Sequence, residues 1–168
     1  DEAAIEKAGT KPLEPWLSKV EGLKSGTDLP KLVAELHGRR LMAGYGFYVG
    51  QDQKETTRYI PMLGQGGLGL PDRDYYLKDD AKSKEIREKY VAHVARMLEL
   101  LGDPAEAAKA KAAVVMDLET KLATAARTRV ELRDPERNYN KRSLGQLVAD
   151  APGYDWKAYL AAMGVPES

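Results

Sequence analysis

The sequence predicts a mainly α-helical fold that contains one small β-hairpin. Long stretches repeat apolar residues at intervals of three and four, which is the period of a helix with one buried face. A single aromatic and β-branched segment is divided by a polar turn, which is typical of a hairpin. At 168 residues the chain has the length of one ordinary domain or of part of one. We therefore expect antiparallel helix pairs and one hairpin within a single domain spanning residues 1–168.

Two helices and the hairpin are expected in the first third of the chain. The helices run from Pro15 to Leu23 and from Leu29 to Met42, and the turn-forming residues 24–27 lie between them. The hairpin is expected to pair residues 46–50 with residues 58–63 across the polar segment that separates them. Pro61 lacks an amide donor, so the second strand should lie at a sheet edge.

Two long helices are expected in the middle of the chain and should pack as an antiparallel pair. The first has a stripe that we expect to be buried, formed by Ile86, Tyr90, His93 or Val94, Met97 and Leu101. Gly102 ends that helix. Asp103 and Pro104 are expected to be the N-cap and the first residue of the second helix. Its expected apolar face contains Val115, Leu118, Leu122 and Ala125 or Ala126.

Two short helices are expected near the end of the chain. Ser143 and Gln146 have the spacing of a capping box, which predicts a helix reaching about Ala149. Pro152-Gly153 then interrupts the chain, and Asp155 is placed to cap a last helix. That helix should carry Trp156, Tyr159 and Leu160.

Composition argues against several classes of function. Lysine plus arginine equals aspartate plus glutamate at 26 each, so no overall positive field attracts nucleic acid or an anionic membrane. No uncharged run approaches the roughly 20 apolar residues that cross a bilayer. The chain contains no cysteine, which excludes disulfides, thiolate catalysis and cysteine-ligated zinc. We expect neither nucleic-acid binding nor membrane contact from this segment.

No catalytic, cofactor-binding or metal-binding residue is predicted from the inventory of side chains. The only histidines, His37 and His93, have no histidine partner one helical turn away, and neither begins an H-E-x-x-H motif. Both are interpreted as ordinary helix or core-edge residues. Residues 72–74, Asp-Arg-Asp, could position a charged ligand, but after Pro71 we favour a role in capping the next helix, with Arg73 holding the loop.

Residues 64–69 formally match the dinucleotide-binding pattern G-x-G-x-x-G. In a nucleotide-binding unit the last glycine lies within the first turns of a helix, whereas here Pro71 would interrupt that helix. The acidic candidates about twenty residues further on, Glu85 and Glu88, lie in a charged helical run and not after a second strand. We therefore interpret the glycines as a loop that needs positive φ angles or close backbone approach.

The segment Gln65–Leu77 carries a specific resemblance. Its sequence, QGGLGLPDRDYYL, is similar to a signature of the neprilysin and endothelin-converting-enzyme family of zinc metallopeptidases. Further segments resemble that family in the same order along the chain: Asp1–Glu6 with Pro12-Leu13, Phe47–Lys54, Leu118-Glu119 with Leu122-Ala123, Arg133-Asp134 through Tyr139-Asn140, and Asp155-Trp156 with Tyr159-Leu160. The short, regularly interrupted sequence is most similar to a bacterial member.

The resemblance implies part of the N-terminal helical half of a two-lobe zinc metalloendopeptidase that hydrolyses peptides. In that family a zinc-bearing lobe faces a helical lobe across a chamber, so this chain would be an incomplete domain that forms part of the chamber wall and size filter. The implied zinc and its ligands lie outside the matched region, so we expect the chain alone to bind no zinc and to be inactive. Implied partners are the catalytic lobe of the same chain and peptide substrates. The implied location is periplasmic or otherwise extracytoplasmic.

One alternative from another class remains open. A helical chain without an active site can be a stand-alone protein-interaction module that binds its partner on an exposed apolar groove. In either case, the apolar helix faces through Ile86 or Val115 lead us to expect homodimers of the isolated chain.

Overall fold

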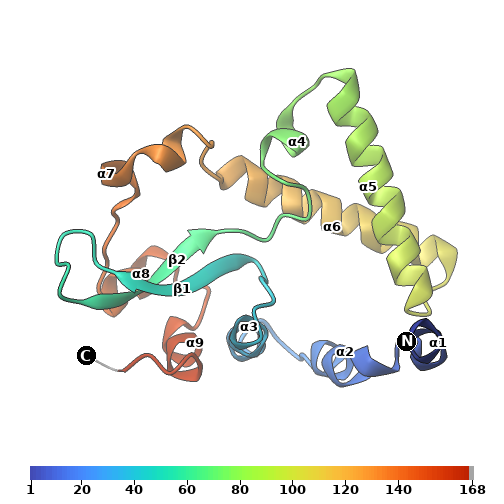
Figure 1. Cartoon of the computed structure of the whole chain (residues 1–168), viewed down its shortest axis with the longest axis horizontal. Coiled ribbons are helices and arrows are strands. Elements are labelled where there is room, and N and C mark those ends of the chain that lie inside the picture. Colours follow the sequence, from blue (N-terminus) through green and yellow to red (C-terminus); the bar gives the residue numbers. More distant parts are fainter. Residues whose placement is uncertain (167–168) are drawn as a thin grey trace. The chain divides into compact units, whose positions relative to one another are not determined.

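A computed structural model describes residues 1–166 as two compact units. The first unit comprises Asp1–Gly64 and the chain from Glu136 onward, and the second comprises Gln65–Pro135. Within the described residues there are nine α-helices and one two-stranded antiparallel sheet (Figure 1). The expected mainly helical fold with a single hairpin is therefore confirmed.

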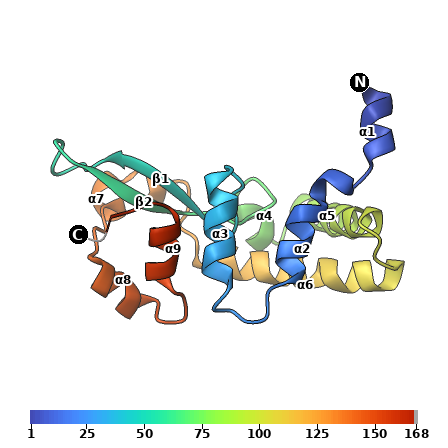
Figure 2. The same cartoon turned by 90° about the horizontal axis from the view of Figure 1, so that it is seen from below.

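The first unit contains the hairpin and most of the short helices. Its elements are α1 (Glu2–Ala8), a 3-10 turn (Lys11–Leu13), α2 (Glu14–Glu21), α3 (Leu29–Gly38), β1 (Tyr45–Gln51), β2 (Tyr59–Gln65), α7 (Pro135–Asn138), α8 (Leu144–Asp150) and α9 (Trp156–Ala162), where β2 and α7 extend to the unit boundary. Helices α3 and α9 lie side by side (Figure 2). The strands contain the predicted segments 46–50 and 58–63 except for Arg58. β1 is one residue longer at each end, and β2 continues two residues further, to Gln65.

Helix α3 ends at Gly38, four residues before the expected Met42. Arg40 has a φ of 64°, the left-handed conformation that ends many helices. The amide of Arg40 donates to the His37 carbonyl at 2.8 Å, and the amide of Leu41 donates to the Leu36 carbonyl at 2.9 Å. These bonds use the last carbonyls of α3, so the chain leaves the helix although its composition would allow another turn.

An aromatic cluster forms the core of the first unit. Tyr159 of α9 is fully buried against Val33 and Ala34 of α3, and several half-buried side chains surround it, including Tyr45, Phe47, Tyr154 and Trp156. The ring of His37 lies at the edge of this core. Its Nδ1 lies 2.7 Å from the Tyr159 hydroxyl, and its Nε2 lies 3.1 Å from the Ala43 carbonyl. The ring thus contacts α9 through Nδ1 and the backbone of Ala43 through Nε2.

The caps predicted for the last two helices are present. The Ser143 side chain accepts from the Gln146 amide, and the Gln146 side chain accepts from the Ser143 amide, which is a complete capping box for α8. The Asp155 carboxylate accepts from the Ala158 amide at 3.0 Å and caps α9. Local sequence therefore sets the beginnings of both helices.

The second unit is built on a pair of long helices. Its elements are α4 (Asp74–Leu77), α5 (Ala81–Leu100), α6 (Ala105–Ala125) and a 3-10 turn (Glu131–Arg133). Helices α5 and α6 pack against each other and are joined by a short loop in which Gly102 has a φ of 104° (Figure 1). Ile86, Tyr90 and Val94 are half-buried, so the predicted stripe of α5 is right at these positions. It is wrong for Met97 and Leu101, which are 49% and 39% exposed. The buried face continues through Ala95 and Leu98, because a helical period of 3.6 residues moves it away from a strict seven-residue repeat.

The start and the face of α6 also differ from the prediction. Pro104 is the N-cap residue with an extended ψ of 144°, so it is not the first helical residue, and Asp103 does not cap the helix. The Asp103 carboxylate instead accepts from the Lys111 ammonium at 2.6 Å. Leu118, expected on the apolar face, is 56% exposed, whereas the neighbouring Glu119 is half-buried. Glu119 faces inward in place of Leu118 because its carboxylate accepts hydrogen bonds from Tyr76 and Tyr90.

A buried carboxylate holds the hairpin turn in the first unit. Asp52 is fully buried, and its Oδ2 accepts from the Lys141 ammonium at 2.6 Å. Its Oδ1 accepts from the Tyr139 hydroxyl at 2.9 Å and from the Lys54 amide at 3.0 Å. The bond from Lys141, followed by the bond from the Lys54 amide, holds the pKa of Asp52 well below its usual range. Asp52 thereby connects the hairpin turn to the segment after α7.

The stability of the first unit should therefore fall in acid. The pKa of Asp52 in the folded chain is below its ordinary value of 3.8, so its contribution is complete above that value and is lost as pH falls through the folded pKa. Asp52→Asn should destabilise the chain most at neutral pH, and the difference from the wild type should shrink below about pH 4. Denaturant unfolding at several pH values measures this difference. Asp150→Asn, which removes an exposed ion pair with Arg142, should have a small effect throughout. A pH-independent effect of Asp52→Asn would contradict this account.

Candidate functional site

The most distinctive part of the sequence, the glycine-rich segment followed by paired tyrosines, forms a loop between β2 and α4. Gly67 has a φ of 76°, a conformation that favours glycine. A side chain at Gly69 would also place its Cβ 1.9 Å from the hydroxyl oxygen of Tyr90. Helix α4 begins only at Asp74, after Pro71, so the last glycine of the formal nucleotide pattern does not lie in a helix. The glycines therefore allow close packing, as the sequence interpretation expected.

Glu119 accepts hydrogen bonds from two tyrosines that belong to different helices. The hydroxyl of Tyr76 in α4 donates to Oε2 at 2.5 Å, and the hydroxyl of Tyr90 in α5 donates to Oε1 at 3.0 Å. The Tyr76 hydroxyl also accepts from the Leu70 amide at 2.8 Å. Burial, followed by the bond to Glu119, raises the pKa of Tyr90 to about 12 and raises that of Tyr76 further. The tyrosines thus remain neutral donors, and one carboxylate joins α4, α5 and α6.

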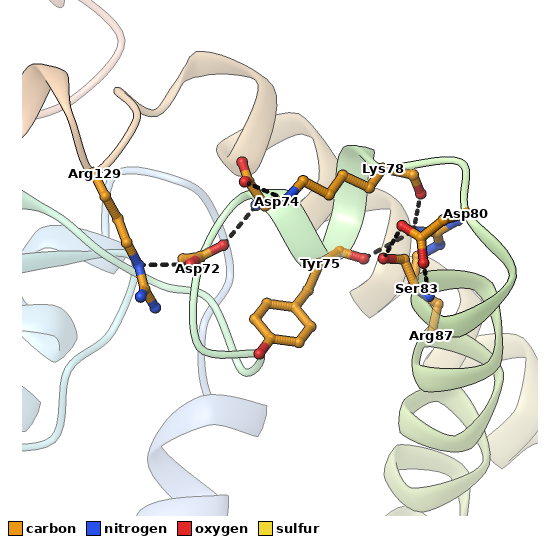
Figure 3. Close-up of polar contacts among 8 residues, drawn as sticks. All are labelled: Asp72, Asp74, Tyr75, Lys78, Asp80, Ser83, Arg87 and Arg129. Carbon is orange, nitrogen blue, oxygen red and sulfur yellow. Dashed lines mark hydrogen bonds and ion pairs between the residues drawn. The ribbon is translucent and has the colours of Figure 1, made fainter.

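Three residues, Gln65, Asp72 and Arg73, tie the loop to the end of α6 and to the segment after it. The Arg73 Nε donates to the Ala123 carbonyl at 3.1 Å, near the C-terminus of α6. Asp72 accepts from Arg129 Nε at 2.7 Å and from the Asp74 amide at 2.8 Å (Figure 3). The Gln65 side chain accepts from the Arg127 amide and donates to the Arg127 carbonyl. Arg73 holds the loop, as expected. The capping expectation is met only through Asp72, which accepts from the amide of the first residue of α4, because the N-cap residue Arg73 makes no side-chain cap bond.

A second set of contacts fixes the turn between α4 and α5. Arg87 of α5 donates to the carbonyls of Tyr75 and Lys78 at 2.8 and 2.9 Å, which are among the last carbonyls of the short helix α4. Asp80 caps α5 through the Ser83 amide at 2.9 Å and its hydroxyl at 2.7 Å (Figure 3). The ring of Tyr75 extends away from these contacts in Figure 3. The motif residues therefore hold together the glycine loop and the helices that follow it.

The polar side chains around the glycine loop make contacts that hold the loop and the neighbouring helices together. No group of three or more histidine, cysteine, aspartate or glutamate side chains in residues 1–166 could hold a metal ion. His37 is engaged in the core of the first unit, and His93 is an exposed residue of α5 in the second. Sequence reasoning did not identify Glu119 and Asp52 as central polar residues. A carboxylate on the inner face of a helix was the available signal for Glu119.

Replacing Gly69 should loosen the loop. Gly69→Ala would place a methyl group within 3.0 Å of three atoms of the Tyr90 side chain, whose hydroxyl is held by Glu119. We expect a loss of about 2 kcal/mol of unfolding free energy, in the range of other overpacked sites. Gly64→Ala is the matched control, since its methyl group would have no atom beyond the adjoining residues within 4 Å. Calorimetry of both variants measures the effect, and equal stability would contradict the close packing at Gly69.

The whole chain matches one family model. Residues 1–168 align with the model for the N-terminal part of Peptidase family M13. The chain belongs to peptidase family M13. Among curated M13 relatives, endothelin-converting enzyme-like 1 from Mus musculus is 32% identical over 95% of this chain and 22% of its own length. Endothelin-converting enzyme 1 from Cavia porcellus is 29% identical over 99% of this chain and 23% of its own length.

Solved M13 structures have the same fold. The zinc metalloprotease Zmp1 of Mycobacterium tuberculosis, in complex with an inhibitor, aligns with a TM-score of 0.90 and 35% identity over 98% of this chain and 25% of its own. PepO from Lactobacillus rhamnosis aligns with a TM-score of 0.71 and 20% identity over 95% of this chain, a likeness that shows the fold alone. This chain thus spans about a quarter of the length of the M13 proteins it matches.

The recognition made from the sequence is confirmed by these comparisons. The chain is a helical N-terminal part of neprilysin-like M13 metallopeptidases, a family of zinc-dependent proteases. The glycine loop with its tyrosine pair, which carried the resemblance, is hydrogen-bonded to α6 through Tyr76 and Glu119. The signature therefore marks a structural junction.

Proposed function

We propose that this chain forms part of the wall and size filter of the substrate chamber of an M13 zinc metalloendopeptidase that hydrolyses peptides. The family match along all 168 residues supports this proposal, together with the lack of a metal-binding cluster in residues 1–166. Catalysis then belongs to the catalytic lobe of the same peptidase, outside residues 1–168. Peptides are the substrates of the complete enzyme.

The side chains of residues 1–166 do not fit the zinc site that the family implies. A catalytic zinc needs three protein ligands that converge on one point. Both nitrogens of His37 contact protein groups in the core, and His93 has no second histidine or carboxylate cluster beside it within residues 1–166. The zinc is therefore held by residues elsewhere in the peptidase, and the polar networks described above serve to shape the helical wall.

The two units are proposed to be parts of one incomplete domain that the rest of the peptidase completes. A periplasmic or otherwise extracytoplasmic location is proposed on the basis of the same family membership. No helix among residues 1–166 has the length and apolar composition required to cross a bilayer. Neither nucleic acid nor a membrane surface is proposed as a partner, because the net charge is zero.

The isolated chain is proposed to form homodimers. Several large apolar side chains are exposed on the outer surface of the α5–α6 pair, namely Met97 at 49%, Leu100 at 55%, Val114 at 68% and Leu118 at 56%. Light scattering over a range of concentrations tests this. A monomer at the highest concentration would contradict the proposal.

The size-filter role can be tested in the full-length peptidase with peptides of increasing length. Glu119→Ala removes the carboxylate that joins α4, α5 and α6 and should loosen the wall. We expect the cleavage rate of long peptides to rise relative to that of short ones. Asp117→Ala, on the same helix but in an exposed ion pair with Lys121, is the matched control and should leave the ratio unchanged. An unchanged ratio for Glu119→Ala would contradict the filter.

A further inference from the structure

A groove runs between α5 and α6 on one side of the helix pair. Its volume is about 700 Å³ and its wall is formed by Arg87, Glu88, Val91, Ala92, Ala95, Arg96, Glu99, Lys109 and Met116. All of these residues belong to the second unit, so the groove is a property of that unit alone. It does not include Glu119 or the glycine loop, and Arg87 is the one lining residue that also takes part in the contacts described above.

The floor of the groove is apolar and shallow. Its apolar lining residues are Val91, Ala92, Ala95 and Met116. Alanine side chains at the floor let another backbone approach closely, as in helix packing at interaxial distances of 8–10 Å. From Glu88 to Glu99 the groove follows α5 for eleven residues, which at 1.5 Å per residue is about 16 Å, or three helical turns. The dimensions suit one short helix.

Four of the five charged side chains on the rim, all except Glu88, have hydrogen-bond or ion-pair partners in the second unit. Arg96 lies 3.1 Å from Glu99, and Lys109 lies 3.0 Å from Glu106. Arg87 donates to two carbonyls of the α4 region (Figure 3). A strongly acidic or basic partner would therefore find little uncompensated charge here. The groove favours an apolar helix face as its occupant.

The size of the groove favours a tethered occupant over a separate molecule. Three turns of a helix about 10 Å wide cover on the order of 200 Å², which is far below the roughly 800 Å² per partner that stable complexes bury. A segment of the same chain avoids most of the entropy loss of association because its effective concentration is high. The relatives and solved structures are about four times as long as this chain, so such segments exist in M13 proteins.

We propose that the α5–α6 groove binds an apolar face of one helix from the part of the same peptidase that lies outside residues 1–168. This inference rests on the proposed function, since it assumes that the chain works as part of a larger M13 protein. It identifies the surface through which the helical wall contacts the rest of the enzyme. The remaining exposed apolar residues of the pair are not needed for this contact.

Thiol labelling tests the proposal without any measurement of activity. The chain has no cysteine, so Ala92→Cys places a unique thiol in the groove of the isolated chain. Ala113→Cys on the exposed surface of α6 is the matched control. N-ethylmaleimide labelling of each site is followed by mass spectrometry of the corresponding peptide, in the isolated chain and in the full-length peptidase. We expect labelling at Ala92→Cys to be at least tenfold slower in the full-length protein, with little change at Ala113→Cys.

Four other outcomes would overturn the proposal. Equal labelling of Ala92→Cys in both proteins would show an open groove. Slow labelling in the isolated chain that becomes faster on dilution would identify a second copy as the occupant, and slow labelling at every dilution would identify another part of this chain. Protection of both positions in the full-length protein would indicate general burial of the pair. A failure of the size-filter experiment alone would leave the labelling result intact.

Introducing a charged side chain into the groove provides a second test, with the melting temperature as the measured quantity. Val91→Asp should lower the melting temperature of the full-length peptidase by several degrees more than that of the isolated chain, because only the former would bury the new carboxylate. Equal shifts in the two proteins would contradict an occupied groove.

Discussion

Tyr159→Ala is expected to destabilise the first unit by about 4 kcal/mol, in the range observed when large buried aromatic side chains are truncated. Tyr159 is fully buried, and its ring lies within 6.1 Å of the rings of Tyr45, Phe47, Tyr154 and Trp156. Its removal would leave a cavity between α3 and α9 and would leave Nδ1 of His37 without a partner. Tryptophan fluorescence during denaturant unfolding reports on this unit, since both Trp16 and Trp156 belong to it.

Two further variants separate the contributions of ring and hydroxyl. Tyr159→Phe keeps the ring and should lose only about 1 kcal/mol, the typical net value of one hydrogen bond. Tyr48→Ala removes an aromatic side chain that is 57% exposed and should change stability by less than about 1 kcal/mol. If Tyr159→Ala were as mild as Tyr48→Ala, the aromatic cluster would not be the core of this unit.

Glu119→Ala should destabilise the second unit by about 3 kcal/mol, because hydrogen bonds to a charged acceptor each contribute roughly 1.5–3 kcal/mol. The substitution leaves the hydroxyls of Tyr76 and Tyr90 without their common acceptor, and Tyr76 is only 4% exposed. This unit contains no tryptophan, so amide hydrogen exchange along α5 and α6 is the suitable measurement. Exchange should become faster along both helices, while the first unit should be unaffected.

The controls for this prediction lie on the same helix and at the same position. Asp117→Ala removes an exposed ion pair with Lys121 and should change stability by less than about 1 kcal/mol. Glu119→Gln keeps the shape but loses the charge and one acceptor oxygen, so it should be intermediate. An effect of Glu119→Ala no larger than that of Asp117→Ala would mean that the carboxylate does not hold the three helices together.

The sequence predicted features that depend on neighbouring residues. The capping box at Ser143, the N-cap at Asp155 and the hairpin each follow from chemistry within a few positions, and all three are present. The loop-holding role of Arg73 was also predicted, and Asp72 accepts from the first amide of α4, which begins three residues after Pro71. The family was recognised from an ordered set of motifs and is confirmed by the family model.

Features set by tertiary contacts were not predictable in the same way. The early end of α3 depends on the left-handed backbone conformation of Arg40. The composition of this segment does not predict that conformation. The exposure of Leu118 and the partial burial of Glu119 are decided by two tyrosine hydroxyls that come from α4 and α5. Asp52 lies in a polar turn by sequence and is buried only because Tyr139 and Lys141 return to it from almost ninety positions away. Contacts between residues so far apart in the sequence cannot be predicted from local sequence patterns.

The central claim is that this M13 chain shapes the enzyme and does not itself catalyse. Its most direct test compares purified residues 1–168 with the full-length peptidase, with zinc supplied to both and zinc content and peptide hydrolysis measured together. We predict stoichiometric zinc and chelator-sensitive hydrolysis only for the full-length protein. Stoichiometric zinc and chelator-sensitive cleavage by residues 1–168 alone would contradict the claim.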